Sequence, residues 1–384
     1  MNSCEDNINE GNMEETKRER NCLKNLWLYL FILVVPGHLL AQYEHDRVNI
    51  TVNKNFELFY AMYLSSDADS IFLANRFSGF SLLTQHNFKL KRNFFDAFSE
   101  YKNSPQVKFY NQLVVKGFGF GGALNVLLRV DQNLNIVDSC FFDEHFPMPK
   151  EAKPEVLKFL TRLKEYSELT NFEEFYKQQQ PEYDAILKIH SQKVHLPELV
   201  SSIENFFGQR ISGYQVTLLP MMWPGGMSLE YKKDCADSLR EIHICIGPKD
   251  VDADRPVFGP DEKFKAVITH EFIHPFVMDH CLIHREEIEQ YAYWYQKHED
   301  VYRNNGCPDW FAAVNEELTR TVEIIITSGD DPEKANKAIE HQSNKLGFPC
   351  IPVFYHAFKK YYSPTARKDI SLDTVFADII RSLD

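Results

Sequence analysis

Two histidines four residues apart, with a glutamate directly after the first, are the residues of this sequence best suited to chemistry. They stand in the segment His270-Glu271-Phe272-Ile273-His274. On a helix, positions four apart share one face with their Cβ atoms roughly 6 Å apart. Both imidazoles can therefore bind one Zn²⁺ at about 2.0–2.1 Å. Glu271 projects about 100° around the helix from His270, where it can take a proton from a water molecule that the metal activates. The spacing predicts metal-assisted hydrolysis.

The composition sets how often this pentapeptide arises without a function. With 14 histidines in 384 residues, random placement produces the pattern in roughly one chain of 25. The context favours the metal site, because a predicted strand at residues 240–246 precedes it and the motif lies in a predicted helix at residues 261–280. A structural protein that carries the motif by chance is the alternative interpretation.

A catalytic zinc needs a third protein ligand and one open position. The amphipathic helix predicted at residues 309–327 has a polar interruption that begins at Asn315 and Glu316. We assign Glu316 as the third ligand, because small residues one turn before it would let the two helices approach. Glu317 is the rival ligand. A solvated face of salt-bridged residues is the alternative reading of this stretch.

A peptide-bond transition state also requires a hydrogen-bond donor for the developing oxyanion. Arg320 lies one helical turn after Glu316, so it could bind either the ligand carboxylate or a substrate carbonyl. His356, in the C-terminal segment FYHAFKKYY, is a second candidate donor.

Pro275 directly follows the second histidine of the motif. Proline cannot donate a hydrogen bond to the carbonyl of Glu271, and it disfavours helical geometry at the residue before it. We therefore expect the helix to kink or end at His274. Such a break could tilt His274 away from the metal, or free the Glu271 carbonyl for another partner.

The hydrophobic pattern predicts an α+β fold that is mostly helical, with a small sheet beside the helix that carries the motif. Strands are expected at residues 47–52, 213–219 and 240–246, and a turn or loop at Pro224-Gly225-Gly226. Helices are expected at 55–64, near 93–115, and at 154–179, 181–190, 196–207, 261–280, 284–303, 309–327, 331–345, 351–362 and 371–383. A boundary near residue 205 would separate an N-terminal, mainly helical region (42–205) from a catalytic region (206–384).

The N-terminus reads as an export signal. Basic residues precede an unbroken apolar run at 26–35, and Ala41 offers a small residue for cleavage. We expect a signal peptide over residues 1–41 and a secreted or periplasmic protein. An uncleaved N-terminal membrane anchor is the alternative, although the run is short for a membrane span. Six of the eight cysteines follow Ala41, which permits complete disulfide pairing after export. Six buried thiols are the alternative.

The charge and composition limit the classes of partner. A net charge of −13 argues against a nucleic-acid partner, since phosphate binding needs clustered Lys and Arg. Hydrophobic residues make up 44% of the chain, which is typical of a folded globular protein. No stable membrane span is expected after signal cleavage, and the sequence leaves the oligomeric state open.

HEFIH followed at a distance by NEELTR resembles the gluzincin metallopeptidases. In them a helical HExxH supplies two zinc ligands and the catalytic glutamate, and a glutamate on a later helix is the third ligand. The resemblance assigns zinc to His270, His274 and Glu316, and catalysis to Glu271. It also implies a zincin-like catalytic region, in which strand 240–246 is an edge strand that pairs with an extended peptide.

A closer resemblance is to an uncharacterised group of bacterial secreted proteins, domain of unknown function family 4932. It rests on the opening VNITVNKNFELFYAMYL, on HEFIHPF, and on the later Glu-x-x-x-Arg motif from Glu316 to Arg320. The expected activity is zinc-dependent cleavage of peptide or protein substrates. The alternative is a catalytically inactive secreted binding protein on the same fold.

Overall fold

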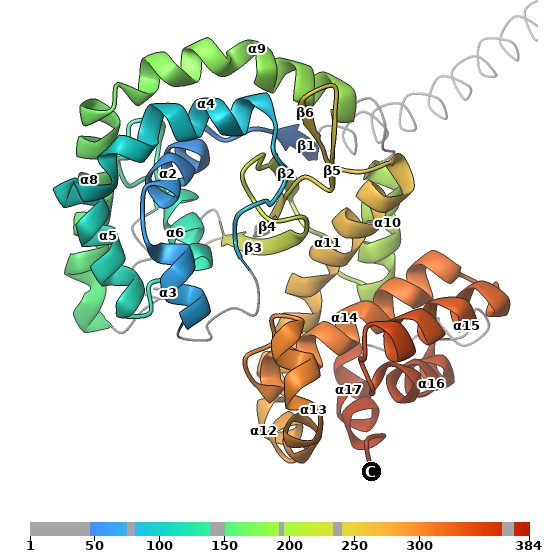
Figure 1. The fold of residues 1–384 in the computed structure, drawn as a ribbon. Helices are drawn as coiled ribbons and strands as arrows, with labels where there is room; N and C mark the ends of the chain where they lie inside the picture. The colour runs from blue at the N-terminus through green and yellow to red at the C-terminus, as the bar shows by residue number, and fades with distance from the viewer. Residues whose placement is uncertain (1–46, 75–80, 139–149, 192–195, 233–239, 363–371) are drawn as a thin grey trace, which may run out of the picture. The chain divides into compact units, whose positions relative to one another are not determined.

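The computed structural model describes residues 47–74, 81–138, 150–191, 196–232, 240–362 and 372–384 (Figure 1). Residues 49–384 form one compact unit. The fold is α+β and mostly helical, with a small sheet beside the helix of the HEFIH motif, which confirms the predicted fold class. The boundary predicted near residue 205 falls inside helix α10 and stays a prediction.

The sheet has four strands in the order β1-β2-β4-β3. Its strands are β1 (Val48–Thr51), β2 (Gly213–Leu218), β3 (Gly226–Lys232) and β4 (Arg240–Ile246). β4 is parallel to β2, with Val216 opposite Ile244, and antiparallel to β3. The expectation that 240–246 is an edge strand is therefore wrong: β4 is an inner strand, and β1 and β3 are the outer strands of the described sheet. β3 was not predicted from the sequence, because it follows the turn signal Pro224-Gly225 and contains no β-branched residue.

Two further strands, β5 (Asp250–Asp252) and β6 (Arg255–Val257), form a small hairpin after β4. Ala253 and Asp254 at its turn both have positive φ, as a tight two-residue hairpin turn requires. Lys249, just before the hairpin, is fixed by a backbone hydrogen bond from its N–H to the carbonyl of Val257 (2.8 Å). The hairpin thus holds the chain that leaves β4.

Helix α11 (Asp261–Ile283) carries the HEFIH motif and packs against β3, β4 and α14. The helix continues for two turns beyond Pro275, so the prediction that it could end at His274 is wrong. Arg240 of β4 donates from Nη2 to the Pro275 carbonyl (3.0 Å) and forms an ion pair with Asp279 one turn later. Contacts on several sides of α11 hold the helix together where proline removes one of its own hydrogen bonds.

Helix α14 (Trp310–Ser328) lies against α11 and supplies the second half of the site (Figure 1). It begins at Asp309, whose side chain accepts a hydrogen bond from the N–H of Ala312, as an N-cap aspartate does. The other helices of the C-terminal half are α12 (Arg285–Glu289), α13 (Tyr293–Asn304), α15 (Pro332–Glu340), the π-helix η3 (His341–Lys345), α16 (Ile351–Tyr361) and α17 (Leu372–Arg381).

The N-terminal helices enclose an aromatic core. These helices are α2 (Lys54–Leu64), α3 (Ala68–Ala74), α4 (Lys89–Phe98), η1 (Ser99–Asn103), α5 (Pro105–Val115), α6 (Phe120–Leu127), η2 (Lys150–Ala152), α8 (Lys153–Leu169), α9 (Phe172–Ser191) and α10 (Leu196–Phe207). Phe59 of α2 contacts the rings of Tyr110, Phe120 and Phe159 from three other helices. The contacts with Tyr110 and Phe159 are edge-to-face, and such contacts stabilise the packing beyond the area that the rings bury.

The helix boundary expected at residue 180 is wrong. The chain breaks earlier, at Asn171, which has a φ of 50°, and α9 then runs through Pro181 without ending. Asparagine tolerates the left-handed conformation better than most residues, which is why it can separate two helices. The single helical pattern expected near 93–115 is likewise divided into α4, η1 and α5.

The predicted signal peptide, with its apolar run, lies outside the described residues, and its alternative as an anchor does too. Within the described residues, none of the helices is both long and apolar enough to cross a membrane. Four of the six cysteines after Ala41 are described, and all four are buried free thiols: Cys245, Cys281, Cys307 and Cys350.

Candidate metal centre

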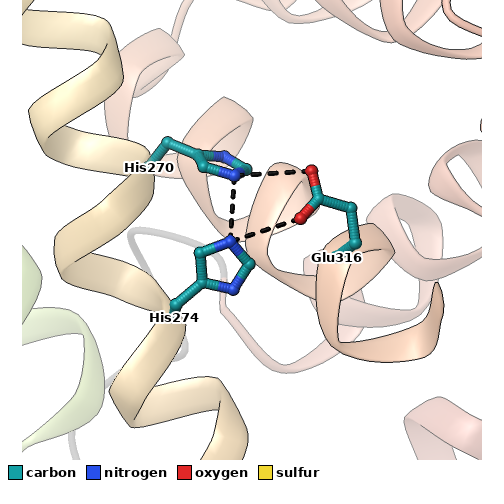
Figure 2. A group of neighbouring side chains, drawn as sticks. All are labelled: His270, His274 and Glu316. Carbon is teal, nitrogen blue, oxygen red and sulfur yellow. Dashed lines mark hydrogen bonds and ion pairs between the residues drawn. The ribbon is translucent and has the colours of Figure 1, made fainter. Parts of the chain in front are cut away.

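Helices α11 and α14 bring three metal-ligating side chains to one point (Figure 2). The Nε2 atoms of His270 and His274 lie 3.0 Å apart. Glu316 places its two carboxylate oxygens 3.4 Å from Nε2 of His270 and 3.2 Å from Nε2 of His274. Ligands that share one tetrahedral zinc at about 2.0–2.1 Å lie roughly 3.3 Å from one another. The spacing of the triad therefore fits a single metal ion, and the group could hold one.

The hydrogen bonds on the far side of each imidazole orient its lone pair toward the triad. Nδ1 of His270 donates to Oε2 of Glu323 (3.2 Å), because a carboxylate can only accept. Nδ1 of His274 donates to Oδ1 of Asn315 (2.7 Å). A neutral imidazole that donates from Nδ1 presents a lone pair at Nε2. Two lone pairs and the Glu316 carboxylate thus converge, an arrangement that a cation stabilises and that metal-binding histidines show.

The charges around the triad also favour a bound cation. Burial lowers the pKa of His270, but the carboxylates of Glu316 and Glu323 outweigh it and raise that pKa to about 10. Burial also acts to raise the pKa of Glu316, but His270 and Arg320 hold it well below its usual value. The carboxylates therefore favour a positive charge at the centre of the triad, which a proton or a metal ion could carry, and the two would compete.

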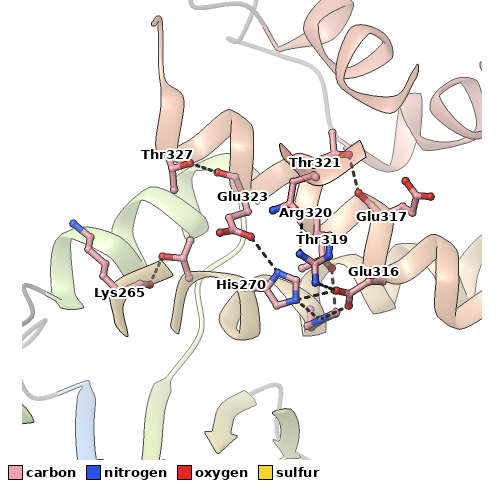
Figure 3. A network of polar contacts seen from close by, with 12 residues as sticks. Lys265, His270, Glu316, Glu317, Thr319, Arg320, Thr321, Glu323 and Thr327 are labelled. Carbon is pink, nitrogen blue, oxygen red and sulfur yellow. Dashed lines mark hydrogen bonds and ion pairs between the residues drawn. The ribbon is translucent and has the colours of Figure 1, made fainter. Parts of the chain in front are cut away.

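A second layer of side chains on α14 supports the triad (Figure 3). Arg320 donates from Nη2 to Oε1 of Glu316 at 2.6 Å and from Nη1 to Gln342 at 2.8 Å. Its guanidinium also lies over the ring of Phe348, 4.4 Å from the ring centre. These contacts hold Arg320 in one orientation, so its role in the structure is to position the Glu316 carboxylate.

Glu271 lies beside the triad, against the start of β3. The residue is 6% exposed, and burial raises the pKa of its carboxyl while His270 and His274 oppose the rise. A Cβ atom on Gly226 would lie 2.4 Å from Oε1 of Glu271, so only glycine fits at this point of β3. A carboxylate whose pKa is raised is suited to exchange a proton with a substrate or water.

The two remaining candidates, Glu317 and His356, do not belong to the triad. Glu317, the rival ligand, points away from the triad and accepts hydrogen bonds from the Tyr302 hydroxyl (2.8 Å) and the Cys350 N–H (3.0 Å). Burial raises the pKa of Glu317 to about 7. It connects α14 to the start of α16, which is a structural role. His356 is exposed on α16 and does not line the cavity at the triad.

A cavity of about 930 Å³ opens onto the triad. Its walls include Gly226, Met227 and Ser228 from β3, and Met278 from α11. The space is large enough for several residues of a peptide, since ligand pockets generally measure about 300–1,000 Å³.

Arg320 was predicted to bind the Glu316 carboxylate, but the other residues that support the ligands were not predicted from the sequence. Glu323 lies seven residues after Glu316 and Thr319 three, so the helical spacing of α14 could have placed all three on one face. Asn315, next to Glu316, faces His274 across the helix pair. No helical spacing could have pointed to Gly226 and Lys249, because their positions depend on β3, and the side-chain pattern did not predict that strand.

Comparison with known proteins places the chain in one family. Residues 48–382 match the family model described as a domain of unknown function (DUF4932). No curated protein and no solved structure matches the chain. Because the match covers most of the sequence, including both helices of the triad, the chain belongs to the DUF4932 family.

Proposed function

We propose that this protein is a zinc-dependent hydrolase that cleaves peptide bonds. The observation that carries the proposal is the convergence of His270, His274 and Glu316 within 4.8 Å of one another, with Glu271 buried beside them. Two histidines and one glutamate are a ligand set of catalytic zinc sites, which keep one coordination position open. The cavity at the triad gives a substrate access to that position.

The proposed roles follow from the positions of the side chains. His270, His274 and Glu316 would hold Zn²⁺, which when bound supplies the positive charge that polarises a substrate carbonyl and lowers the pKa of a water molecule. Glu271 takes the proton of the attacking water and passes it to the leaving amine. Arg320 keeps Glu316 in place through their ion pair at 2.6 Å.

A peptide substrate is supported by the outer strand. Among the described strands β3 pairs with β4 alone, and its first three residues line the cavity. An extended peptide could add to such an edge by backbone hydrogen bonds, which bind any sequence. The position of β3 beside the triad would bring a peptide carbonyl to the metal.

The resemblance to gluzincin metallopeptidases also supports this assignment, since HExxH and a glutamate on a later helix are their ligand pattern. Secretion of the protein is part of the proposal and rests on the N-terminal sequence alone. Peptide or protein substrates fit the gluzincin-like ligand pattern, and an extracellular or periplasmic compartment fits the N-terminal sequence. The acidic net charge of −13 disfavours nucleic acid as a partner.

Metal analysis tests the proposal most directly. Wild-type protein purified without chelator should carry about one zinc ion per chain by plasma mass spectrometry. His270→Ala and Glu316→Ala should each lower the zinc content at least about tenfold, because either change removes a ligand. His356→Ala, which removes an exposed histidine outside the site, should leave it unchanged. Wild-type protein without bound metal would overturn the proposal.

A substitution at Gly226 separates the position of Glu271 from metal binding. In Gly226→Ala the added methyl group meets the Glu271 carboxyl at 2.4 Å, which must move. We expect peptidase activity to fall about 10- to 100-fold, since a displacement near 1 Å is enough for that loss, while zinc content stays normal. The control is Gly121→Ala, whose methyl group meets Met227 at an ordinary 3.5 Å. Equal activities of the two variants would contradict the prediction.

A further inference from the structure

Lys249 is a second feature of the cavity that the proposed reaction does not use. It lines the same cavity as the triad, at the end where β3 begins. Its backbone N–H is bound to Val257, and its Nζ donates to the carbonyl of Pro224 at 2.9 Å. The ammonium has three donors, so two of them are left for a ligand. The two anchors hold the side chain at one place in the wall.

The other cationic side chain in the cavity wall is already bound to neighbouring side chains. Arg320 has its ion pair with Glu316 and its hydrogen bond to Gln342. Lys249, by contrast, has no ion pair in the described part of the chain. Burial lowers the pKa of Lys249, the charge of the Glu271 carboxylate opposes this fall without a hydrogen bond, and the charge of Lys263 adds to it. A positive charge with free donors therefore faces the cavity next to the proposed general base.

We infer that Lys249 binds a substrate carboxylate, so that the protein prefers peptides with a negative charge on the C-terminal side of the cleaved bond. This inference rests on the proposed peptidase function and adds its substrate class. The carboxylate could belong to the C-terminus of the peptide or to an acidic side chain, because both present the same group.

The direction of β3 determines which end of a peptide meets Lys249. β3 runs from Gly226 to Lys232, and Pro224, the partner of Lys249, lies two residues before its start. A peptide antiparallel to β3 brings its C-terminal part toward Pro224 and Lys249. A parallel peptide brings its N-terminal part, whose ammonium group Lys249 repels. Charge complementarity thus selects the antiparallel orientation and a carboxylate.

The turn before Lys249 shows how tightly the position of this residue is fixed. A Cβ atom on Gly247 would lie 1.8 Å from the carbonyl oxygen of Trp223, so this glycine lets the two chain segments touch. The N–H of Gly247 also donates to the carbonyl of Gly225 at 2.9 Å. The segment with Lys249 is therefore fixed against the residues that lead into β3, and the ammonium is a fixed point of the cavity rather than a free surface lysine.

Matched peptide pairs test the inference. Acetylated, internally quenched peptides of eight residues carry either a free C-terminus or a C-terminal amide, and a second series exchanges Glu for Gln at each position. Wild-type protein should cleave the charged member of at least one pair about tenfold better in kcat/KM, mainly through KM. Lys249→Met should bring that ratio close to one, and Lys249→Arg should largely restore it. Lys263→Met removes a neighbouring exposed lysine of α11 and should leave the ratio unchanged.

Binding gives a readout without turnover. The Glu271→Gln protein, which keeps the three proposed ligands, should bind the fluorescein-labelled charged peptide about tenfold more tightly than its neutral partner. Cleavage of charged and neutral peptides at equal rates would overturn the role of Lys249 and leave the peptidase proposal intact. Zinc-loaded protein that discriminates between the peptides in binding but cleaves none would support Lys249 and overturn the peptidase. Failure to bind or cleave any peptide would overturn both.

Discussion

Glu271→Gln is expected to lower the turnover of peptide substrates at least about 100-fold while the protein keeps its zinc. The substitution preserves the size of a side chain that is 6% exposed and packed against Gly226. It removes only the ability to accept a proton, and general acid–base catalysis contributes about 10²- to 10⁴-fold in enzymes. The three proposed ligands are unchanged. The measurement is kcat on a cleaved peptide, with zinc content determined on the same preparation.

Glu262→Gln is the matched control. Glu262 is an exposed glutamate in the first turn of α11, so its replacement changes the charge of the same helix without entering the cavity. Its turnover should equal that of wild type. A Glu271→Gln variant with normal turnover would exclude Glu271 as the general base. Wild-type protein that carries zinc and cleaves none of the peptides tested would favour the alternative of a binding protein on this fold.

The site could be predicted from sequence where helical spacing carried the information. The distance of four residues between His270 and His274 fixes their common face on any helix. Glu316 could be predicted because a catalytic zinc needs a third protein ligand. Polar residues that interrupt the apolar pattern of a later helix are unusual, and this marked Glu316 as the candidate. The structure adds the fact that these three side chains meet, with nitrogen and oxygen atoms 3.0–3.4 Å apart.

The features that were missed depend on tertiary contacts. Proline inside α11 is tolerated because Arg240 of β4 and the packing on several sides hold the helix together, and none of these contacts is local in sequence. The side-chain pattern does not predict β3, because this strand follows Pro224-Gly225 and has no β-branched residue. As a consequence the outer position in the sheet was assigned to the wrong strand, and neither Gly226 nor Lys249 was recognised.

Glu57→Gln is expected to make the protein more stable than wild type at pH 8, by up to about 4 kcal/mol, while the two differ little at pH 5. Glu57 of α2 is fully buried in the aromatic core. Burial raises the pKa of its carboxyl to about 8, and a hydrogen bond from the Tyr183 hydroxyl (2.8 Å) opposes the rise only partly. The folded protein therefore keeps this carboxyl protonated under conditions in which the unfolded chain has lost the proton.

The sign of the pH dependence follows from this difference. The folded state binds more protons than the unfolded state between the ordinary pKa of 4.5 and the raised value of about 8, so stability falls as the pH rises through that window. The contribution of the protonated Glu57 is fully present below pH 4.5 and is lost above pH 8. Glutamine is neutral throughout, and its amide occupies the place of the protonated oxygen. In the wild type this oxygen is Oε1 of Glu57, and it has no hydrogen-bond partner among the described residues.

Urea denaturation at four pH values between 5 and 8 measures the effect as the difference in unfolding free energy between Glu57→Gln and wild type. Using the difference cancels contributions from the metal centre, which both proteins share. Glu100→Gln, at an exposed glutamate of η1, is the control and should follow the wild-type curve. Parallel curves for Glu57→Gln and wild type would show that Glu57 is ionised in the folded core. The buried carboxyl would then need a cationic partner, since burying an unpaired charge is far more unfavourable than burying a neutral acid.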